Sequence, residues 1–243
     1  YWVQSRLPAK KPLVFTPRVK RLAGSLALVS LLVSALLVFG LGMLSSVLLL
    51  PLLTPLLLAL SALAALPLEK LIQRLYLKDA MKRLHAMEDL IKIGITGSYG
   101  KTSTKFMLET ILSEKYRVLV TPGSFNTSMG VTRVIRERLS PDHQVFIAEM
   151  GARHRGDIRL LCKLVRPRYG ILTSVGPQHL ETFRTQENIL KEKFELARAI
   201  PPDGAMVFGS DGGLNDGLYE KAACEKHLAG QRAESLGLTV KDV

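Results

Sequence analysis

The longest run of this sequence without a charged side chain spans 47 residues, from Leu22 to Leu68. A bilayer has a hydrocarbon core about 30 Å thick, which a helix of about 20 residues crosses. The run is therefore long enough for two membrane-spanning helices, which we predict at 22–39 and 44–66, with a turn at Gly40 and Gly42. The alternative is a buried helical hairpin of a soluble protein, which would also lack charged side chains.

Basic residues border this run on both sides. The positive-inside rule places basic borders in the cytoplasm, and two spans satisfy it at both ends whereas one span does not. A secretory signal explains the run poorly because its apolar region has only about 7–15 residues. We therefore expect a multi-pass protein of the cell membrane, in contact with the lipid bilayer, with a basic cytoplasmic segment over 1–21. The bordering residues are Arg6, Lys10, Lys11, Arg18, Lys20 and Arg21 before the run, and Lys70, Arg74, Lys78, Lys82 and Arg83 after it.

The formal net charge of +12 has to be read together with that run. In a soluble protein such a charge would indicate a nucleic-acid partner, but much of the excess here lies beside the apolar run, where it can meet anionic lipid head groups. We therefore expect no nucleic-acid partner. The two cysteines, Cys162 and Cys224, lack metal-ligand spacing and indicate ordinary thiols of a reducing compartment.

After the run, the pattern changes to that of an amphipathic helix over 69–90, with apolar residues at helical spacing. This helix either connects to the next domain and packs on it or lies along a membrane surface. Over 91–243 short apolar runs alternate with helical patterns, which predicts an α/β domain with a parallel sheet covered on both faces. We expect strands at Ile91–Ile95, Val118–Val120, Val145–Ala148, Gly170–Val175 and Ala205–Phe208, and helices at Lys101–Glu114, Val131–Arg138, Asp157–Leu164 and Gln186–Ala199.

A glycine-rich segment, Gly-Ile-Thr-Gly-Ser-Tyr-Gly-Lys-Thr-Ser over 94–103, lies between the first strand and the first helix of this domain. Its glycines let the backbone approach phosphate oxygens, and the N–H groups at the start of the helix supply donors. The lysine would reach the β- and γ-phosphates, and the threonine hydroxyl would bind Mg²⁺. We therefore predict a P-loop ATPase domain whose ATP site includes Gly97, Ser98, Tyr99, Gly100, Lys101, Thr102 and Ser103.

The segment departs from the general pattern of such phosphate loops. That pattern would need a glycine at position 95, which is Ile95, so the loop here is shorter. A segment this short also occurs in ordinary turns. Its position between an apolar strand and a helix is what favours nucleotide binding.

Five segments, in the same order along the chain, resemble those of the Mur ligases. Within the family, the Glu149-Met-Gly and Pro201-Pro-Asp-Gly forms are most similar to the branch that adds D-alanyl-D-alanine to the cell-wall precursor. The matching segments are Thr96–Lys105, Phe125–Gly130, Ala148–Gly151, Thr173–Glu181, and Ile189–Leu196 followed by Pro201–Gly204.

The resemblance implies an enzyme that uses ATP to phosphorylate a carboxylate and then lets an amine attack the acyl phosphate, which forms an amide bond. Its partners would be ATP, a cell-wall precursor carboxylate, and an amino acid or dipeptide. This reaction needs cations at the γ-phosphate and at the acceptor carboxylate, a role for Mg²⁺. The resemblance implies Mg²⁺ ligands at Thr102, Glu149 and His179, and a phosphate or metal contact at Asn126.

Lys193 matches the lysine that Mur ligases convert to a carbamate, which would turn a cation into a further carboxylate-like Mg²⁺ ligand. With Lys101 and His179 it completes the implied catalytic set. Lys191 is the alternative in register, and a solvated charged helix face is the alternative in function. The basic loop Arg-His-Arg over 153–155 either is solvated or approaches an anionic substrate.

Two other classes of protein stay open. One is a non-catalytic, nucleotide-binding membrane scaffold with the Mur ligase fold, although a scaffold would need none of the implied catalytic residues. The other is an unrelated P-loop ATPase or transporter component, which the short glycine loop disfavours. The chain starts without methionine and ends at Val243, just after a strand-like pattern over 238–240. We therefore expect a fragment that lacks the flanking domains of the family.

Overall fold

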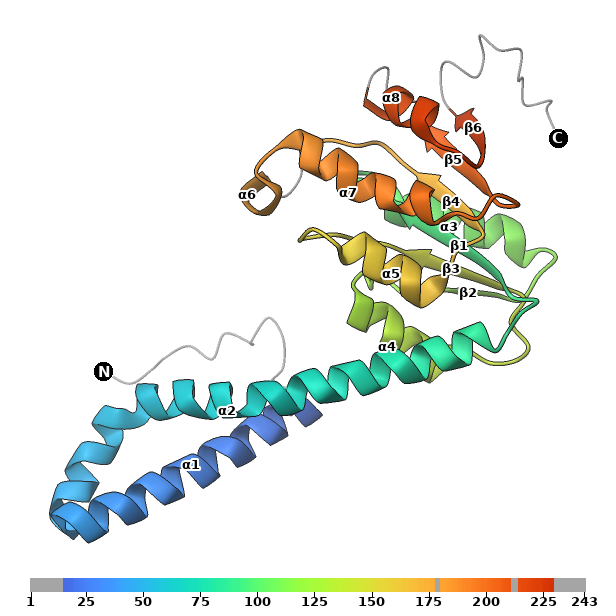
Figure 1. The fold of residues 1–243 in the computed structure, drawn as a ribbon. Helices are drawn as coiled ribbons and strands as arrows, with labels where there is room; N and C mark the ends of the chain where they lie inside the picture. The colour runs from blue at the N-terminus through green and yellow to red at the C-terminus, as the bar shows by residue number, and fades with distance from the viewer. Residues whose placement is uncertain (1–14, 178–179, 211–213, 230–243) are drawn as a thin grey trace, which may run out of the picture. The chain divides into compact units, whose positions relative to one another are not determined.

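The computed structural model describes residues 15–177, 180–210 and 214–229. Figure 1 shows the helices and strands of these ranges. Three predictions lie outside the described residues: the metal ligand His179, the strand-like pattern over 238–240, and the basic residues before position 15. The chain divides into two compact units, Tyr1–Arg74 and Leu75–Val243, and each is described by itself.

The first unit contains helix α1, Pro17–Leu41, and most of helix α2, Met43–His85. Gly42 separates them with a φ of 84°, a positive value that glycine adopts readily, so the predicted turn is present at Gly42, whereas Gly40 lies inside α1. The helix expected over 69–90 ends at His85 and is continuous with the preceding helix. Residues 69–85 are the last part of α2, because no glycine or asparagine ends the helix between 56 and 85. Prolines at positions 51, 55 and 67 lie inside α2 without ending it.

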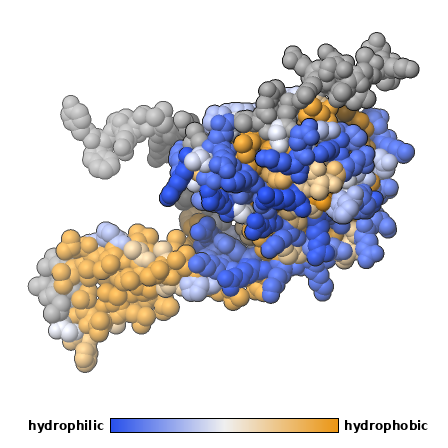
Figure 2. Space-filling model, turned by 45° about the horizontal axis from the view of Figure 1, so that its top comes forward, coloured by the Kyte–Doolittle hydropathy of each residue, from blue (hydrophilic) through white to orange (hydrophobic). Residues whose placement is uncertain are grey.

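Polar contacts join α1 to α2 near the ends of the apolar run. Arg21 Nε lies 2.6 Å from Glu69 Oε1, and Ser25 Oγ donates to the Ser61 carbonyl over 3.4 Å. Ser61 itself is fully buried. Most of the large apolar side chains of this unit are exposed, as Figure 2 shows, with Phe39 97% exposed. Two helices of the described chain, Pro17–Gly40 and Leu49–His85, are long and apolar enough to cross a membrane, a finding that rests on length and composition alone.

The second unit is built on a six-stranded sheet in the order β2-β3-β1-β4-β5-β6. All its neighbouring strands are parallel, which confirms the predicted α/β class. The strands are β1 Ile91–Thr96, β2 Val118–Val120, β3 Val145–Glu149, β4 Tyr169–Leu172, β5 Ala205–Gly209 and β6 Glu225–Ala229. The helices after α2 are α3 Lys101–Ser113, α4 Ser128–Arg138, α5 Asp157–Val165, α6 Leu180–Phe183, α7 Gln186–Ala199 and α8 Leu214–Lys221.

The sequence did not predict β6, α6 or α8. Strand β6 has alternating exposed and half-buried residues and includes Glu225, Lys226 and His227, a composition typical of an edge strand but weak as a strand signal. Strand β4 ends at Leu172, three residues earlier than predicted. Its continuation departs from the sheet because it bonds to the glycine loop: the Ser98 N–H donates to the Ser174 carbonyl over 2.8 Å.

Two hydrophobic clusters cover the two faces of the sheet, and successive residues of β3 alternate between them. Ile147 belongs to one cluster, which packs against α3 through Leu108 and Leu112. Phe146 belongs to the other, which includes residues of α4, α5, α7 and the end of α2. Figure 1 shows α3 on the opposite side of the sheet from α5 and α7. The end of α2 thus packs on the α/β domain, which is the first of the two alternatives predicted for this helix. An ion pair of 2.8 Å joins Asp79 of α2 to Arg136 of α4.

This topology creates a crevice at the carboxyl ends of β1 and β3. The two strands are neighbours, but the helices that follow them, α3 and α5, leave toward opposite faces. Ligands of open α/β sheets bind in such crevices, beyond the carboxyl ends of the strands. The glycine loop and Glu149 both lie at this edge, since they end β1 and β3 respectively.

Candidate active site

The glycine loop between β1 and α3 needs glycine at two positions. Gly97 has a φ of 147° and Gly100 a φ of 80°, values that other residues rarely adopt. A Cβ on Gly97 would lie only 1.9 Å from Thr173 Oγ1. Gly100 is the N-cap of α3 and has no side chain to cap it, so the first N–H groups of the helix point outward as donors for an anion.

The loop is held in shape from the side of β4. Ser98 Oγ donates to the Gly176 carbonyl over 3.0 Å, and Thr173 Oγ1 donates to the Tyr99 carbonyl over 2.6 Å. Ser98 is almost completely buried. These contacts fix the backbone of the loop before any ligand arrives, which reduces the entropy that binding would cost.

Lys101 folds back over the loop that precedes it. Its Nζ donates to the Gly97 carbonyl over 2.8 Å and to the Ser98 carbonyl over 2.9 Å. Burial lowers the pKa of the ammonium, and the charge of Glu149 opposes that effect. The ammonium therefore already lies over the predicted phosphate site, bound by carbonyl groups of the loop.

The Glu149 carboxylate, at the end of β3, is only 1% exposed. Its Oε2 accepts hydrogen bonds from Thr102 Oγ1 over 3.0 Å and from Lys105 Nζ over 2.9 Å. Its Oε1 accepts one from Asn126 Nδ2 over 3.1 Å. Burial by itself would raise the pKa of this carboxyl, but the donors outweigh burial and the pKa lies below its ordinary value. The structure thus brings together three predicted site residues: Thr102, Asn126 and Glu149.

Sequence reasoning missed Lys105, whose side chain is fully buried against Glu149. A signal was available. Lys105 follows Lys101 by four residues on a helix, which places both side chains on one face. That spacing predicts proximity to the phosphate loop, but it does not reveal that a carboxylate from β3 lies opposite.

A cavity of about 490 Å³ lies beside the loop and contains Lys101, Asn126 and Lys193 among its lining residues. Lys193 is 5% exposed, and within the described part of the chain its ammonium has no hydrogen-bond partner. Burial, with the charge of Lys101 second, lowers the pKa of Lys193 to about 8. Lys191, the alternative in register, is exposed and pairs with Glu187 at 2.6 Å. Lys193, and not Lys191, therefore lines the cavity.

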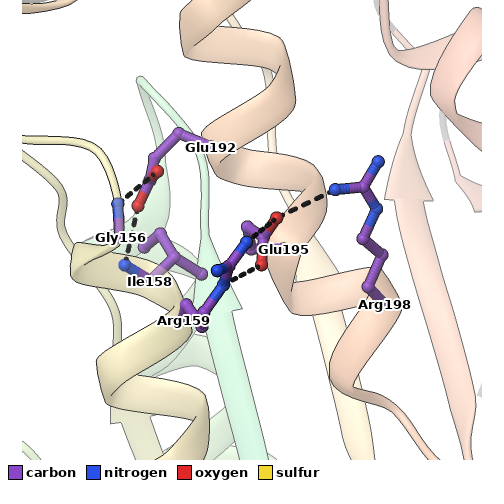
Figure 3. A network of polar contacts seen from close by, with 6 residues as sticks. All are labelled: Gly156, Ile158, Arg159, Glu192, Glu195 and Arg198. Atoms are coloured by element: carbon purple, nitrogen blue, oxygen red, sulfur yellow. Dashed lines mark hydrogen bonds and ion pairs between the residues drawn. The ribbon is translucent and has the colours of Figure 1, made fainter.

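Glu192, the neighbour of Lys193 on α7, ties that helix to the start of α5. Figure 3 shows its carboxylate accepting hydrogen bonds from the backbone N–H groups of Gly156 and Ile158, each over 2.8 Å. Gly156 is the N-cap of α5 and cannot cap the helix with a side chain, so Glu192 supplies the cap from another helix. One turn further along α7, Glu195 joins Arg159 of α5 to Arg198, again as Figure 3 shows.

The three residues of the basic loop over 153–155 line two different hollows. Asp157 Oδ2 accepts the N–H groups of Arg153 and His154 over 2.8 and 2.9 Å, which closes the loop. Arg153 and His154 line the cavity of Lys193. Arg155 instead lines a separate hollow between α5 and α7.

The donor set at the crevice suits Mg²⁺. No group of three or more His, Cys, Asp or Glu side chains gathers for a metal among the residues described here, with His179 outside them. Glu149, Thr102 and Asn126 offer a carboxylate, a hydroxyl and an amide, and Mg²⁺ prefers such oxygen ligands in small number, completed by phosphates and water. Both cysteines are buried, and neither lines the cavity of Lys193.

Comparison with known proteins agrees with this geometry. Residues 95–241 match the Mur ligase middle domain. The chain belongs to the Mur ligase family. The UDP-N-acetylmuramoyl-tripeptide–D-alanyl-D-alanine ligase of Treponema pallidum is 42% identical over 130 residues, 50% of this chain and 28% of that relative. The ligase of the same name from Bacillus subtilis is 32% identical over 127 residues, 52% of this chain and 28% of that relative.

Solved structures give the same assignment. MurF from Acinetobacter baumannii superposes with a TM-score of 0.62 at 31% identity, over 65% of this chain and 35% of that one. MurF from Thermotoga maritima, solved in complex with ADP, has a TM-score of 0.59 at 31% identity, over 64% of this chain and 36% of that one. The matched region therefore spans only about a third, or less, of the length of these relatives.

We predict that Gly97→Ala weakens nucleotide binding by this Mur ligase middle domain roughly 10- to 100-fold, since backbone strain of this kind costs about 1–3 kcal/mol. The added methyl group would collide with Thr173 Oγ1, and the φ of 147° disfavours alanine. Isothermal titration with ADP measures the effect. Gly217→Ala is the matched control, because a Cβ there meets nothing within 4 Å. Equal ADP affinity in Gly97→Ala and the wild type would contradict the loop geometry.

We also predict that Glu192→Ala destabilises the domain by about 1–3 kcal/mol, because two N–H groups at the start of α5, that of Ile158 buried, lose their acceptor. Thermal unfolding in mild detergent, followed by circular dichroism, gives the change. Glu187→Ala, an exposed carboxylate on the same helix, should leave the midpoint almost unchanged. A larger effect of Glu187→Ala than of Glu192→Ala would refute the assigned cap.

Proposed function

We propose that the whole protein is an ATP-dependent ligase that forms an amide bond in cell-wall precursor synthesis, like the UDP-N-acetylmuramoyl-tripeptide–D-alanyl-D-alanine ligases it resembles. The observation that carries the proposal is the placement of Lys193. A buried lysine with a lowered pKa lines the same cavity as the phosphate-loop lysine, Lys101. Nucleotide binding alone requires no second lysine there.

The residues of the crevice would divide the work of acyl-phosphate formation. The N–H groups at the start of α3 and the Lys101 ammonium would hold the phosphates of ATP. Thr102, Glu149 and Asn126 would hold Mg²⁺, which neutralises phosphate charge when bound. Arg153 and His154, at the wall of the cavity, are placed to bind and orient the carboxylate that receives the phosphoryl group. These positions favour a carboxylate as acceptor, since both side chains can offer donors to it.

The surroundings of Lys193 support the proposal that it forms a carbamate. The reaction needs the neutral amine. Its lone pair attacks the carbon of CO₂, the N–C bond forms as one C=O π bond breaks toward oxygen, and the nitrogen releases a proton to water. At pH 7.5 a pKa of about 8 leaves roughly a quarter of the amines neutral, against about one in a thousand at the ordinary value of 10.5. The product is an anion near the Lys101 ammonium, so attraction replaces the repulsion between two cations.

We further propose that residues 22–68 cross a lipid bilayer twice and that the ATPase domain lies in the cytoplasm. The exposed apolar side chains of α1 and α2 support this, because the exposure of so much apolar surface to water is unfavourable. The pair Arg21–Glu69 supports it too. These residues border the apolar run at its two ends, and their contact of 2.6 Å places both ends together, as two spans require.

The ligase proposal predicts that Lys193→Ala abolishes amide formation from UDP-N-acetylmuramoyl-tripeptide and D-alanyl-D-alanine in the full-length protein, and that an added short carboxylic acid restores part of it. The added acid would supply the oxygens that the carbamate provided. NMR of protein equilibrated with ¹³C-labelled CO₂ should show a carbamate signal in the wild type and none in Lys193→Ala.

Lys191→Ala is the matched control for that experiment. It removes an exposed lysine two positions away on the same helix, so both turnover and the carbamate signal should persist. If Lys193→Ala keeps full turnover, or if the carbamate signal disappears in Lys191→Ala instead, the role of Lys193 is wrong.

The membrane proposal predicts the labelling pattern of single cysteines in intact cells. A membrane-impermeant maleimide added outside should not modify Lys20→Cys or Lys70→Cys, because both borders would face the cytoplasm. It should modify Met43→Cys, at the start of α2, where the side chain is 76% exposed. External labelling at position 20 or 70 would exclude this topology, and lack of labelling at position 43 would exclude an exposed turn.

A further inference from the structure

The crevice contains an ion pair that is removed from water completely. Lys105 of α3 is 0% exposed and Glu149 of β3 is 1% exposed, with 2.9 Å between Nζ and Oε2. Lys105 Nζ also donates to the carbonyl of Gly123, in the loop after β2. One ammonium therefore joins three parts of the domain: α3, the end of β3 and the loop that carries Asn126.

Stability alone explains such a pair poorly. Desolvation of two charges offsets most of their attraction, so apolar residues of similar volume would often serve as well. Removing only one partner is a different matter, because it leaves a buried charge with no counter-ion. The pair thus makes the domain dependent on a cation beside Glu149.

Three donors occupy the Glu149 carboxylate, and they come from elements that the nucleotide would touch. Thr102 and Lys105 share Oε2, and Asn126 takes Oε1. The bond from Lys105 to Gly123 fixes the loop that presents Asn126. On its other side the Asn126 amide lies close to Gly151, where an added Cβ would come within 2.6 Å of the Asn126 Cγ.

We propose that Lys105 is a positioning residue, a built-in counter-cation that holds the Glu149 carboxylate in place and limits how tightly the nucleotide-free site binds a divalent cation. This inference rests on the proposed role of Glu149 as a Mg²⁺ ligand. With Lys105 present, the carboxylate already has a counter-ion. A free divalent ion that binds there would therefore recover little of the free energy that its dehydration costs. The ion then binds well only together with the phosphates of the nucleotide, which restricts metal binding to the complex that reacts.

The test compares the nucleotide-free wild type with Lys105→Met, using Mn²⁺ alone as the probe. Binding of Mn²⁺, followed by electron paramagnetic resonance, should become at least about tenfold tighter in the variant, because a unit positive charge has gone from beside the ligand. Without metal, the variant should unfold at a lower temperature than the wild type. Added Mn²⁺ should raise its unfolding midpoint more than that of the wild type, since the metal replaces the missing cation.

Two further variants separate this role from simple packing. The double variant Lys105→Met/Glu149→Gln removes both charges and should regain stability relative to Lys105→Met while losing the tighter Mn²⁺ binding. Lys115→Met removes a lysine just beyond the end of α3, where the chain is exposed, and should change neither quantity. If Lys105→Met does not fold, Lys105→Gln gives the same comparison, because its amide keeps a donor for Gly123.

The proposal is overturned if the Lys105 variant binds Mn²⁺ no more tightly than the wild type. It is also overturned if the double variant is no more stable than Lys105→Met, because the defect would then come from lost packing and not from an unpaired carboxylate. Both measurements are made without nucleotide or turnover. Absence of ligase activity in the wild type would therefore contradict only the proposed function.

Discussion

The Glu149 carboxylate is the contact on which the rest of the site depends. It ends the strand next to β1, and its donors come from α3 and from the loop after β2. Because the carboxylate is buried, each of these donors must stay in place or leave a charge without compensation. The first turns of α3 are thereby held against the end of β3. The glycine loop immediately precedes α3, so its position is fixed as well.

The opposite wall of the cavity depends on carboxylates of a different kind. Glu192 and Asp157 accept backbone N–H groups, so they shape the chain from Arg153 to Ile158. Glu192 also sets the distance between α5 and α7, and Lys193 follows it directly in the sequence. The site therefore depends on one carboxylate that pairs with a lysine and on two that accept backbone N–H groups. Arg153 and Lys193 face the same space as a result.

Sequence predicted the parts of this domain that local chemistry determines. Alternating apolar and helical patterns gave the parallel sheet, and glycines beside a lysine gave the loop, because both signals depend on neighbours in the chain. Lys105 and Glu192 were missed because their partners are distant in the sequence. Glu149 lies 44 residues from Lys105, and Gly156 lies 36 residues from Glu192, so no local pattern reveals either contact. The continuous α2 was missed because the change from apolar to amphipathic composition resembled a boundary, although no residue there ends a helix. His179 remains a prediction from resemblance.

Three lysines of this site show how partners, and not the side chain, decide the chemistry. Lys101 donates hydrogen bonds to two carbonyl groups of its own loop, which fix the position of its ammonium. Phosphate oxygens of a bound nucleotide could replace these carbonyl groups as acceptors. Lys105 lies 2.9 Å from a buried carboxylate, which suits a fixed counter-ion. Lys193 is buried beside Lys101 and has no hydrogen-bond partner among the described residues, so its neutral form is favoured. Of the three environments, only that of Lys193 favours the neutral amine that the proposed carbamate requires. The charges of Glu192 and Asp157 oppose this effect but do not outweigh burial and the charge of Lys101.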